Sequence, residues 1–158
     1  MPVDVVVAGY LCIDLIPHFH GAPRAIHELF RPGAIIDVEG MTMTLGGVVA
    51  NSGLALQRFG CSTTPMALVG RDALGEMVVS LLNNQGISGA ISRSNDAKTS
   101  FSVVLSPPGT DRIFLECCGA NDLFSPADGE PPASLRESCS TALCWVPGRR
   151  PPSGYTAW

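Results

Sequence analysis

The sequence predicts an α/β fold in which a parallel β-sheet is covered by helices. Residues 3–9, VDVVVAG, form a short Val-rich run that ends in glycine, as a buried strand does. A helix is then expected over 48–59, a strand over 64–69 and a second helix over 73–85. Alternation of strands and helices in this order is typical of a parallel sheet with covering helices.

The two expected helices have recognisable ends and apolar faces. The helix over 48–59 stops at Gly60, a residue that favours the left-handed conformation found at helix ends. The helix over 73–85 begins after Asp72, which is placed to cap its N-terminus. Its apolar residues recur at the spacing of one helical face, and they are Leu74, Met77, Val78, Leu81 and Leu82.

Further short segments favour strands outside this alternating pattern. Residues 34–38, AIIDV, and 41–45, MTMTL, flank Gly40, and the second alternates apolar and polar residues as a half-exposed strand does. Residues 100–105 and 112–116 bracket a Ser-Pro-Pro-Gly-Thr-Asp turn, which indicates a β-hairpin with a longer loop.

The stretch LGGVVANSGLALQRFG, residues 45–60, is the first candidate binding segment. Gly46 and Gly47 lead into Asn51, which lies in the first turns of the expected helix. Glycines allow positive φ and close approach of the backbone to a ligand, and amide groups at a helix start have no partner inside the helix. An asparagine amide both donates and accepts hydrogen bonds. These groups suit a polyol such as a sugar; the alternative is a glycine turn followed by a packing helix.

Asp14 is the second candidate, because it lies just beyond the first predicted strand. A carboxylate past the carboxyl end of a parallel strand sits where open α/β sheets bind ligands. It can accept hydrogen bonds from two adjacent sugar hydroxyls. The alternative is an aspartate that serves only a loop or a helix cap.

Composition excludes several classes of function. The chain has 158 residues and a net charge of −4, which gives no footprint for nucleic acid. It contains no apolar stretch of the ~20 residues needed to span a bilayer, and no basic, signal-like segment opens it. We therefore expect a cytoplasmic protein without a membrane partner. The six cysteines form no C-x-x-C pair, so we expect no metal site, and in the cytoplasm we expect them to be reduced thiols.

Taken together, these segments resemble the pfkB-type, ribokinase-like carbohydrate kinases. The matching pieces are VVVAGYLCIDLIP at 5–17, LGGVVANSGLALQRFG at 45–60 and ALVGRDALGE at 67–76, with CCGAND at 117–122 in support. The resemblance covers residues 3 to about 127. It implies a ribokinase-like three-layer sandwich with a small β-sheet lid, formed from about 34–45 and 99–116, that closes over a sugar.

The same resemblance implies roles for individual residues. Asp14 and Asn51 would hydrogen-bond the sugar, and the backbone of Gly46 and Gly47 would lie against it. ATP would donate its γ-phosphoryl group with the help of Mg²⁺. Cys12 and Val48 stand where ribokinase-type sequences often carry polar substrate contacts, so the sugar need not be ribose.

The lid adds two weaker expectations by resemblance. Phe101 and Val103 would pack on the substrate if they face inward from the lid. The lid would also serve as the surface of a homodimer.

The resemblance stops near residue 130. A pfkB-type enzyme would continue into an ATP-binding half with a late G-A-G-D-like motif whose aspartate takes the proton from the sugar hydroxyl, and this sequence contains no G-A-G-D. We therefore expect residues 1–130 to be a substrate-binding portion without a catalytic residue, truncated before the ATP-binding half and inactive alone. Residues 131–158 form a divergent Pro- and Arg-rich tail, consistent with a frameshift or a mis-joined exon, although a genuine short tail is the alternative.

Other phosphate- and acyl-transfer motifs are missing from the sequence. It contains no G-x-x-x-x-G-K-[ST], no G-x-G-x-x-G after the first strand and no G-x-S-x-G. The competing expectation is therefore a non-catalytic module that binds a sugar or forms a dimer.

Overall fold

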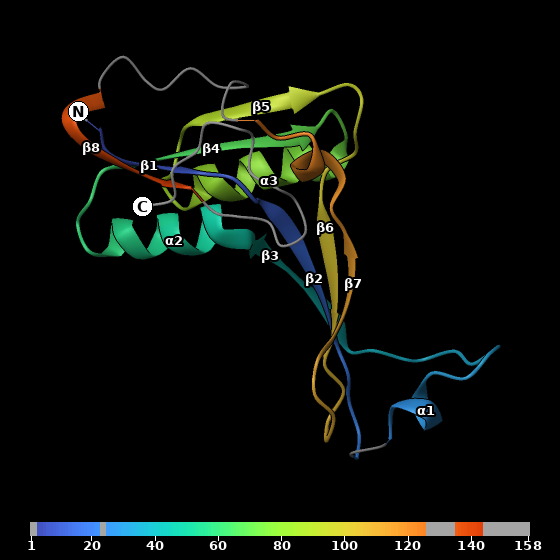
Figure 1. The fold of residues 1–158 in the computed structure, drawn as a ribbon. Coiled ribbons are helices and arrows are strands. Elements are labelled where there is room, and N and C mark those ends of the chain that lie inside the picture. Colours follow the sequence, from blue (N-terminus) through green and yellow to red (C-terminus); the bar gives the residue numbers. More distant parts are fainter. Residues whose placement is uncertain (1–2, 23–24, 126–134, 144–158) are drawn as a thin grey trace.

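The computed structural model folds the chain into two four-stranded β-sheets, one of which projects away from the other (Figure 1). The structure describes residues 3–22, 25–125 and 135–143. We call the sheet that carries the long helices the core sheet and the projecting sheet the lid sheet.

The core sheet has the strand order β5-β4-β1-β8, and each neighbouring pair is parallel. Parallel neighbours need long crossover connections, which the helices supply between β4 and its neighbours. The predicted parallel sheet with covering helices is thereby confirmed. Its strands are β1 (Val3–Ala8), β4 (Thr63–Gly70), β5 (Ala90–Ser94) and β8 (Leu135–Leu143).

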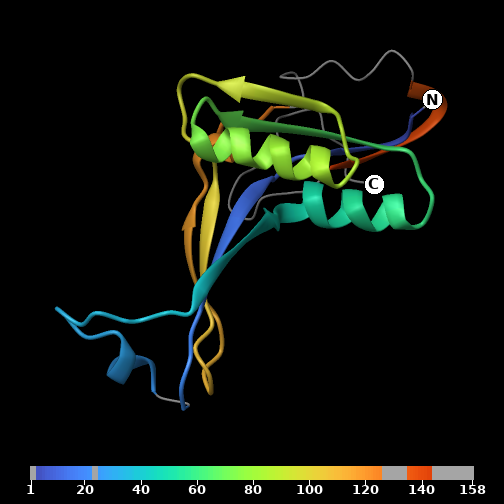
Figure 2. The same cartoon turned by 180° about the vertical axis from the view of Figure 1, so that it is seen from behind.

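Two long helices, α2 (Gly47–Arg58) and α3 (Ala73–Asn84), lie on the same side of the core sheet (Figures 1 and 2). They bury part of the predicted apolar stripe of α3, because Val78 and Leu82 are fully covered. The cluster that these helices form with the strands contains Leu11, Ile13, Leu45, Val49, Ala50, Ala67, Val69, Val78, Leu82 and Ile87. A smaller cluster of Val6, Ala8 and Met66 covers the other side of the sheet.

The lid sheet has the order β3-β2-β6-β7. β2 pairs antiparallel with β3 and parallel with β6, and β6 and β7 form the predicted antiparallel hairpin. Two short helices, α1 (Ile26–Leu29) and η1 (Gly119–Asp122), complete the described elements. The lid strands are β2 (Cys12–His18), β3 (Gly40–Gly46), β6 (Phe101–Leu105) and β7 (Ile113–Cys117).

One expected lid strand is absent, and another strand takes its place. Residues 34–38 form no strand, and Ile35 is 98% exposed, so this apolar segment has nothing to pack against. β2 instead pairs with β3 along seven residues, from Cys12 opposite Gly46 to His18 opposite Gly40. The alternation of Ile13 and Leu15 with Asp14 was the sequence signal for β2, and β5 was likewise not expected.

The core sheet continues beyond residue 130, where a divergent tail was expected. β8 pairs in parallel with β1, from Val5 opposite Ser140 to Ala8 opposite Leu143. Residues 126–134 and 144–158 lie outside the described residues, and so does most of the predicted tail.

Candidate functional site

Asp14 lies within the lid sheet on β2, and not in a loop beyond the first strand. The chain turns at Gly9, whose φ is 130°, and enters the lid sheet three residues later. Asp14 is paired with Thr44 on β3 and with Ser102 on β6, and Ser102 is paired with Glu116 on β7. Directly paired residues share one face of a sheet. Thr44, Asp14, Ser102 and Glu116 therefore form one line across the lid sheet, which we call the polar row.

The two candidate glycines lie where a side chain would not fit. A Cβ atom on Gly46 would lie 2.5 Å from both carboxylate oxygens of Asp14. Gly47 has a φ of +85°, and a Cβ there would lie 2.5 Å from the backbone oxygen of Tyr10. The close approach expected of this glycine pair is thus made by the chain itself, and it sets the Asp14 carboxylate directly against the start of α2.

Asn51 lies one turn into α2, on the same side of the helix as Gly47, because residues four apart are neighbours on a helix surface. Its side chain is exposed and forms no hydrogen bond with another described residue. No side chain caps this helix, although the Val49 amide donates to the Tyr10 backbone oxygen at 3.1 Å. The structure therefore brings Asp14, Gly46, Gly47 and Asn51 together around one helix start.

The carboxylate of Asp14 has few partners of its own. The Cys12 thiol donates to its Oδ1 at 3.5 Å, a long and weak hydrogen bond. Burial raises the pKa of Asp14 above its ordinary value, the bond from Cys12 partly opposes the shift, and the charge of Glu116 adds to it. Burial, followed by the charge of Asp14, raises the pKa of the Cys12 thiol to about 12, so this thiol stays protonated at neutral pH.

Tyr10 links the lid sheet to the start of α2. Its hydroxyl donates to Oε1 of Glu116, while its backbone oxygen accepts from Val49. Burial raises the pKa of the Tyr10 phenol, and the bond to Glu116 raises it further, so the phenol remains a donor. Sequence analysis singled out neither Tyr10 nor Glu116, because their relation depends on register between distant strands.

Phe101 and Val103 lie on the other face of the lid sheet. They are paired with Ile13 and Leu15, the residues immediately before and after Asp14 on β2. Successive side chains of a strand point to opposite faces. Phe101 accordingly packs against the main core cluster. The structure does not bring these two residues to the face that carries Asp14.

A buried asparagine fixes the connection between the two sheets. Asn121 is 7% exposed, and its side chain accepts from the Leu11 amide at 3.0 Å and donates to the Leu11 carbonyl at 3.0 Å. Its own amide donates to the Ser100 hydroxyl at 3.2 Å. This pair of bonds locks the segment between β1 and β2, and so it sets the position of Asp14.

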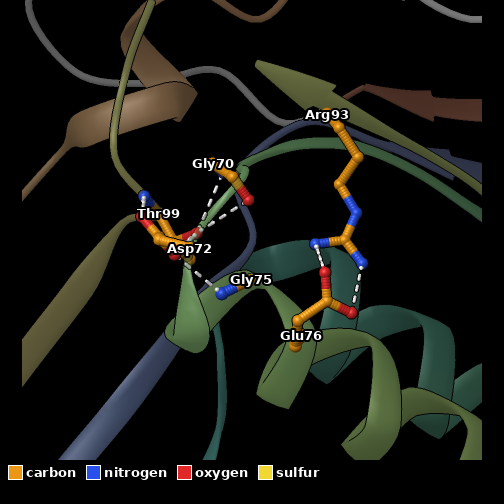
Figure 3. Close-up of polar contacts among 6 residues, drawn as sticks. All are labelled: Gly70, Asp72, Gly75, Glu76, Arg93 and Thr99. Carbon is orange, nitrogen blue, oxygen red and sulfur yellow. Dashed lines mark hydrogen bonds and ion pairs between the residues drawn. The ribbon is translucent and has the colours of Figure 1, made fainter. Parts of the chain in front are cut away.

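Asp72 joins the core sheet to the lid sheet at a second point (Figure 3). One carboxylate oxygen accepts from the Gly75 amide at 2.9 Å, which confirms the predicted cap of α3, and from the Thr99 hydroxyl at 2.7 Å. The other accepts from the Thr99 amide at 2.9 Å. The Thr99 hydroxyl also accepts from the Gly70 amide at 2.9 Å. The end of β4, the start of α3 and the approach to β6 thus converge on one carboxylate.

Beside this junction, Arg93 on β5 forms an ion pair with Glu76 on α3, with N–O distances of 3.0 and 3.1 Å (Figure 3). Burial on its own would raise the pKa of Asp72, but the bonds from Thr99 and Gly75, aided by the charge of Lys98, hold it below its ordinary value. The carboxylate of Asp72 is therefore a structural group whose partners all come from the chain itself.

The described part of the chain offers no metal centre. No group of three or more His, Cys, Asp or Glu within it is arranged to hold a metal ion. The four described cysteines, Cys12, Cys61, Cys117 and Cys118, are free thiols. Among these same residues, no helix has the length and apolar character that crossing a membrane requires.

Comparison with known proteins identifies the family. The model of the pfkB family of carbohydrate kinases matches residues 3–140. The chain belongs to this family. A curated relative, the 5-dehydro-2-deoxygluconokinase of Geobacillus kaustophilus, is 29% identical, and the alignment covers 94% of this chain and 43% of the relative.

Solved structures give the same fold. The ribokinase of Giardia lamblia superposes with a TM-score of 0.66 at 19% identity, covering 79% of this chain and 39% of that one. The ribokinase of Cryptococcus neoformans, solved in complex with ADP, gives a TM-score of 0.60 at 25% identity and covers 84% of this chain and 40% of its own. The ribokinase-like fold is thereby confirmed. The chain spans less than half the length of each of these proteins.

Proposed function

We propose that this chain is the sugar-binding portion of a kinase that transfers the γ-phosphoryl group of ATP to a hydroxyl of a sugar or sugar-like alcohol. The observation that supports this most strongly is the position of Asp14. Its carboxylate lies against Gly46 at the start of α2, and within the described residues it has only a weak bond from Cys12. A carboxylate in this state is available to accept hydrogen bonds from substrate hydroxyls.

In this proposal each residue has a distinct task. Asp14 accepts hydrogen bonds from two sugar hydroxyls, and the Asn51 amide binds another from one helical turn away. Because Gly46 and Gly47 have no side chains, a sugar ring can lie against the backbone at the start of α2. Tyr10 and Asn121 position these groups through Glu116 and Leu11, and they need not touch the sugar.

ATP and Mg²⁺ would bind outside the described residues. ATP would supply the phosphoryl group, and Mg²⁺ would neutralise charge on its phosphates. We assign no residue of this chain to either group, because the sequence contains no G-A-G-D-like motif. We therefore propose that the chain alone binds sugar without turnover.

The boundary of the sugar-binding portion is part of the same proposal. We expected it near residue 130, with a divergent segment over 131–158. The family match to residue 140 and the pairing of β8 with β1 favour a boundary about ten residues later.

The kinase proposal is tested by expressing the complete reading frame of the locus and measuring ATP-dependent phosphorylation over a panel of sugars and polyols. Replacement of Asp14 by Asn in an active product should lower kcat/KM by roughly 10²-fold or more, because a charge-assisted hydrogen bond is lost. A near-wild-type kcat/KM would contradict the assignment of Asp14.

A second candidate role is dimer formation through the lid sheet. The face opposite the polar row carries exposed apolar side chains, with Met41 48%, Met43 41% and Leu115 54% exposed. A second copy of the chain would cover this face. Sedimentation velocity should show a dimer that Leu115→Asp dissociates, whereas Phe59→Asp, at an 84% exposed residue outside the lid sheet, should leave it intact. Equal sedimentation of all three proteins would contradict the dimer.

A further inference from the structure

The polar row continues past the residues assigned to the sugar. Glu116 lies two strands away from Asp14 across β6, which places their backbones about 10 Å apart in a sheet. Both carboxylates belong to the same face of the lid sheet, and the charge of Glu116 contributes to the raised pKa of Asp14. A ligand held between α2 and this face would therefore meet two carboxylates rather than one.

Two side-chain hydroxyls of the polar row, those of Ser102 and Thr44, form no hydrogen bond within the described part of the chain. Ser102 is 7% exposed, yet its hydroxyl forms no hydrogen bond with any other residue that the structure describes. The same holds for the hydroxyl of Thr44 at the other end of the row. A hydroxyl that has no partner within the chain is free to bind a ligand or water. The row therefore has the character of a binding surface.

The charge of this face is one-sided. The polar row contains two carboxylates and no basic side chain. Arg112, which immediately precedes β7, lies four residues from Glu116 with its guanidinium over the Phe114 ring, at 5.7 Å from the centroid. His18 lies four residues from Asp14 and bonds the Thr42 hydroxyl at 2.7 Å. Neither of these interactions directs a cation at the pair of carboxylates.

We propose that Glu116 is a specificity-determining residue, which favours substrates that present hydroxyl groups to the lid face and disfavours substrates that present a carboxylate there. This inference rests on the proposed function. A hydroxyl can donate to the Glu116 carboxylate, whereas a substrate carboxylate would be repelled by the like charges of Asp14 and Glu116. Tyr10 is the positioning residue, because its hydroxyl donates to Oε1 of Glu116 and leaves Oε2 without a bond from Tyr10.

The test uses pairs of sugars that differ only in CH₂OH against COO⁻, namely glucose with glucuronate and galactose with galacturonate. NMR titration of the 158-residue chain gives the ratio of neutral to acidic affinity for each pair. Wild type should prefer the neutral member, and Glu116→Gln should lower this preference roughly tenfold or more. Glu28→Gln, the same substitution at an exposed position on α1, is the matched control and should leave the ratio unchanged.

Two further measurements keep the inference testable if Glu116→Gln does not fold. Raising the salt concentration should lower the neutral preference of wild type, because ions screen the repulsion. Glu116→Asp, which keeps the charge, should retain the preference. A preference that is insensitive to both Glu116→Gln and salt would overturn the role of Glu116 while leaving the proposed function intact. Absence of binding for every sugar, with no change on Asp14→Asn, would overturn both.

Discussion

Two aspartates of this fold, Asp14 and Asp72, have opposite hydrogen-bonding environments. Asp72 accepts three hydrogen bonds from the chain, two of them from backbone amides, and ties three elements together. Asp14 accepts one weak bond from a thiol and lies against a glycine. The pKa of Asp72 is lowered by its partners, whereas the pKa of Asp14 is raised by burial.

This difference separates a structural carboxylate from a binding one. Folded proteins satisfy nearly all of their buried polar groups, so a saturated network is what stability alone would produce. The hydroxyls of the polar row and the partly buried Asp14 carboxylate have few partners within the chain, so they add little to stability and are available to bind a ligand. The comparison predicts that changes at the Asp72 junction reduce stability and changes in the polar row reduce binding.

The largest change in the free energy of unfolding is expected at Gly47, the first residue of α2 beside the candidate site. Gly47→Ala would place a Cβ 2.5 Å from the Tyr10 oxygen at a φ of +85°. Gly60 has the same φ of +85° with nothing within 4 Å, so Gly60→Ala measures the conformational strain alone. Urea denaturation should show a loss of about 1 kcal/mol for Gly60→Ala and about 3 kcal/mol or more for Gly47→Ala. Equal losses would show that the contact with Tyr10 is unimportant.

Removal of the Asp72 carboxylate should have the next largest effect. Asp72→Ala loses the cap of α3 and both bonds to Thr99, which should lower the free energy of unfolding by about 2 kcal/mol. Asp96→Ala, at an exposed aspartate near the same junction, is the control and should change it by less than about 0.5 kcal/mol. If the two variants were equally stable, Asp72 would not be the anchor that its contacts indicate.

The two aspartates should also give opposite pH dependence. The folded pKa of Asp72 is lowered, so its stabilising contribution is present above its unfolded pKa and is lost as pH falls toward the folded value. The folded pKa of Asp14 is raised, so its ionisation reduces stability as pH rises through the folded value. In urea denaturation between pH 3 and 7, Asp72→Asn should flatten the acid loss of stability and Asp14→Asn should steepen it. Slopes identical to wild type would contradict both assignments.

The smallest stability effect is expected at Asp14 at neutral pH. Asp14→Asn removes a desolvated charge with one weak partner, so the free energy of unfolding should stay within about 0.5 kcal/mol of wild type or rise slightly. A loss of 2 kcal/mol or more would mean that Asp14 is a structural residue like Asp72.

The sequence was sufficient for the features that local patterns determine. The spacing of Val78 and Leu82 predicted the buried side of α3, Asp72 predicted its cap, and the 5–17 and 45–60 motifs predicted the family. It was not sufficient for features that depend on pairing between distant strands. The polar row joins Asp14, Ser102 and Glu116 only through strand register. Whether Phe101 faces the substrate could not be predicted either, because the sequence does not show which side of a strand in the lid faces the core.

The central claim is that Asp14 and the polar groups around it, which have few partners within the chain, bind a sugar, whereas the Asp72 carboxylate, whose partners come from the chain, does not. The most direct test is the change in backbone amide NMR shifts of the ¹⁵N-labelled chain on addition of a panel of neutral sugars. The account predicts saturable shifts at Gly46, Gly47 and Asn51 that are lost in Asp14→Asn, with Gly75 and Thr99 unaffected. Saturable shifts centred on Gly75 and Thr99, or shifts at Gly46 and Gly47 that persist in Asp14→Asn, would contradict it.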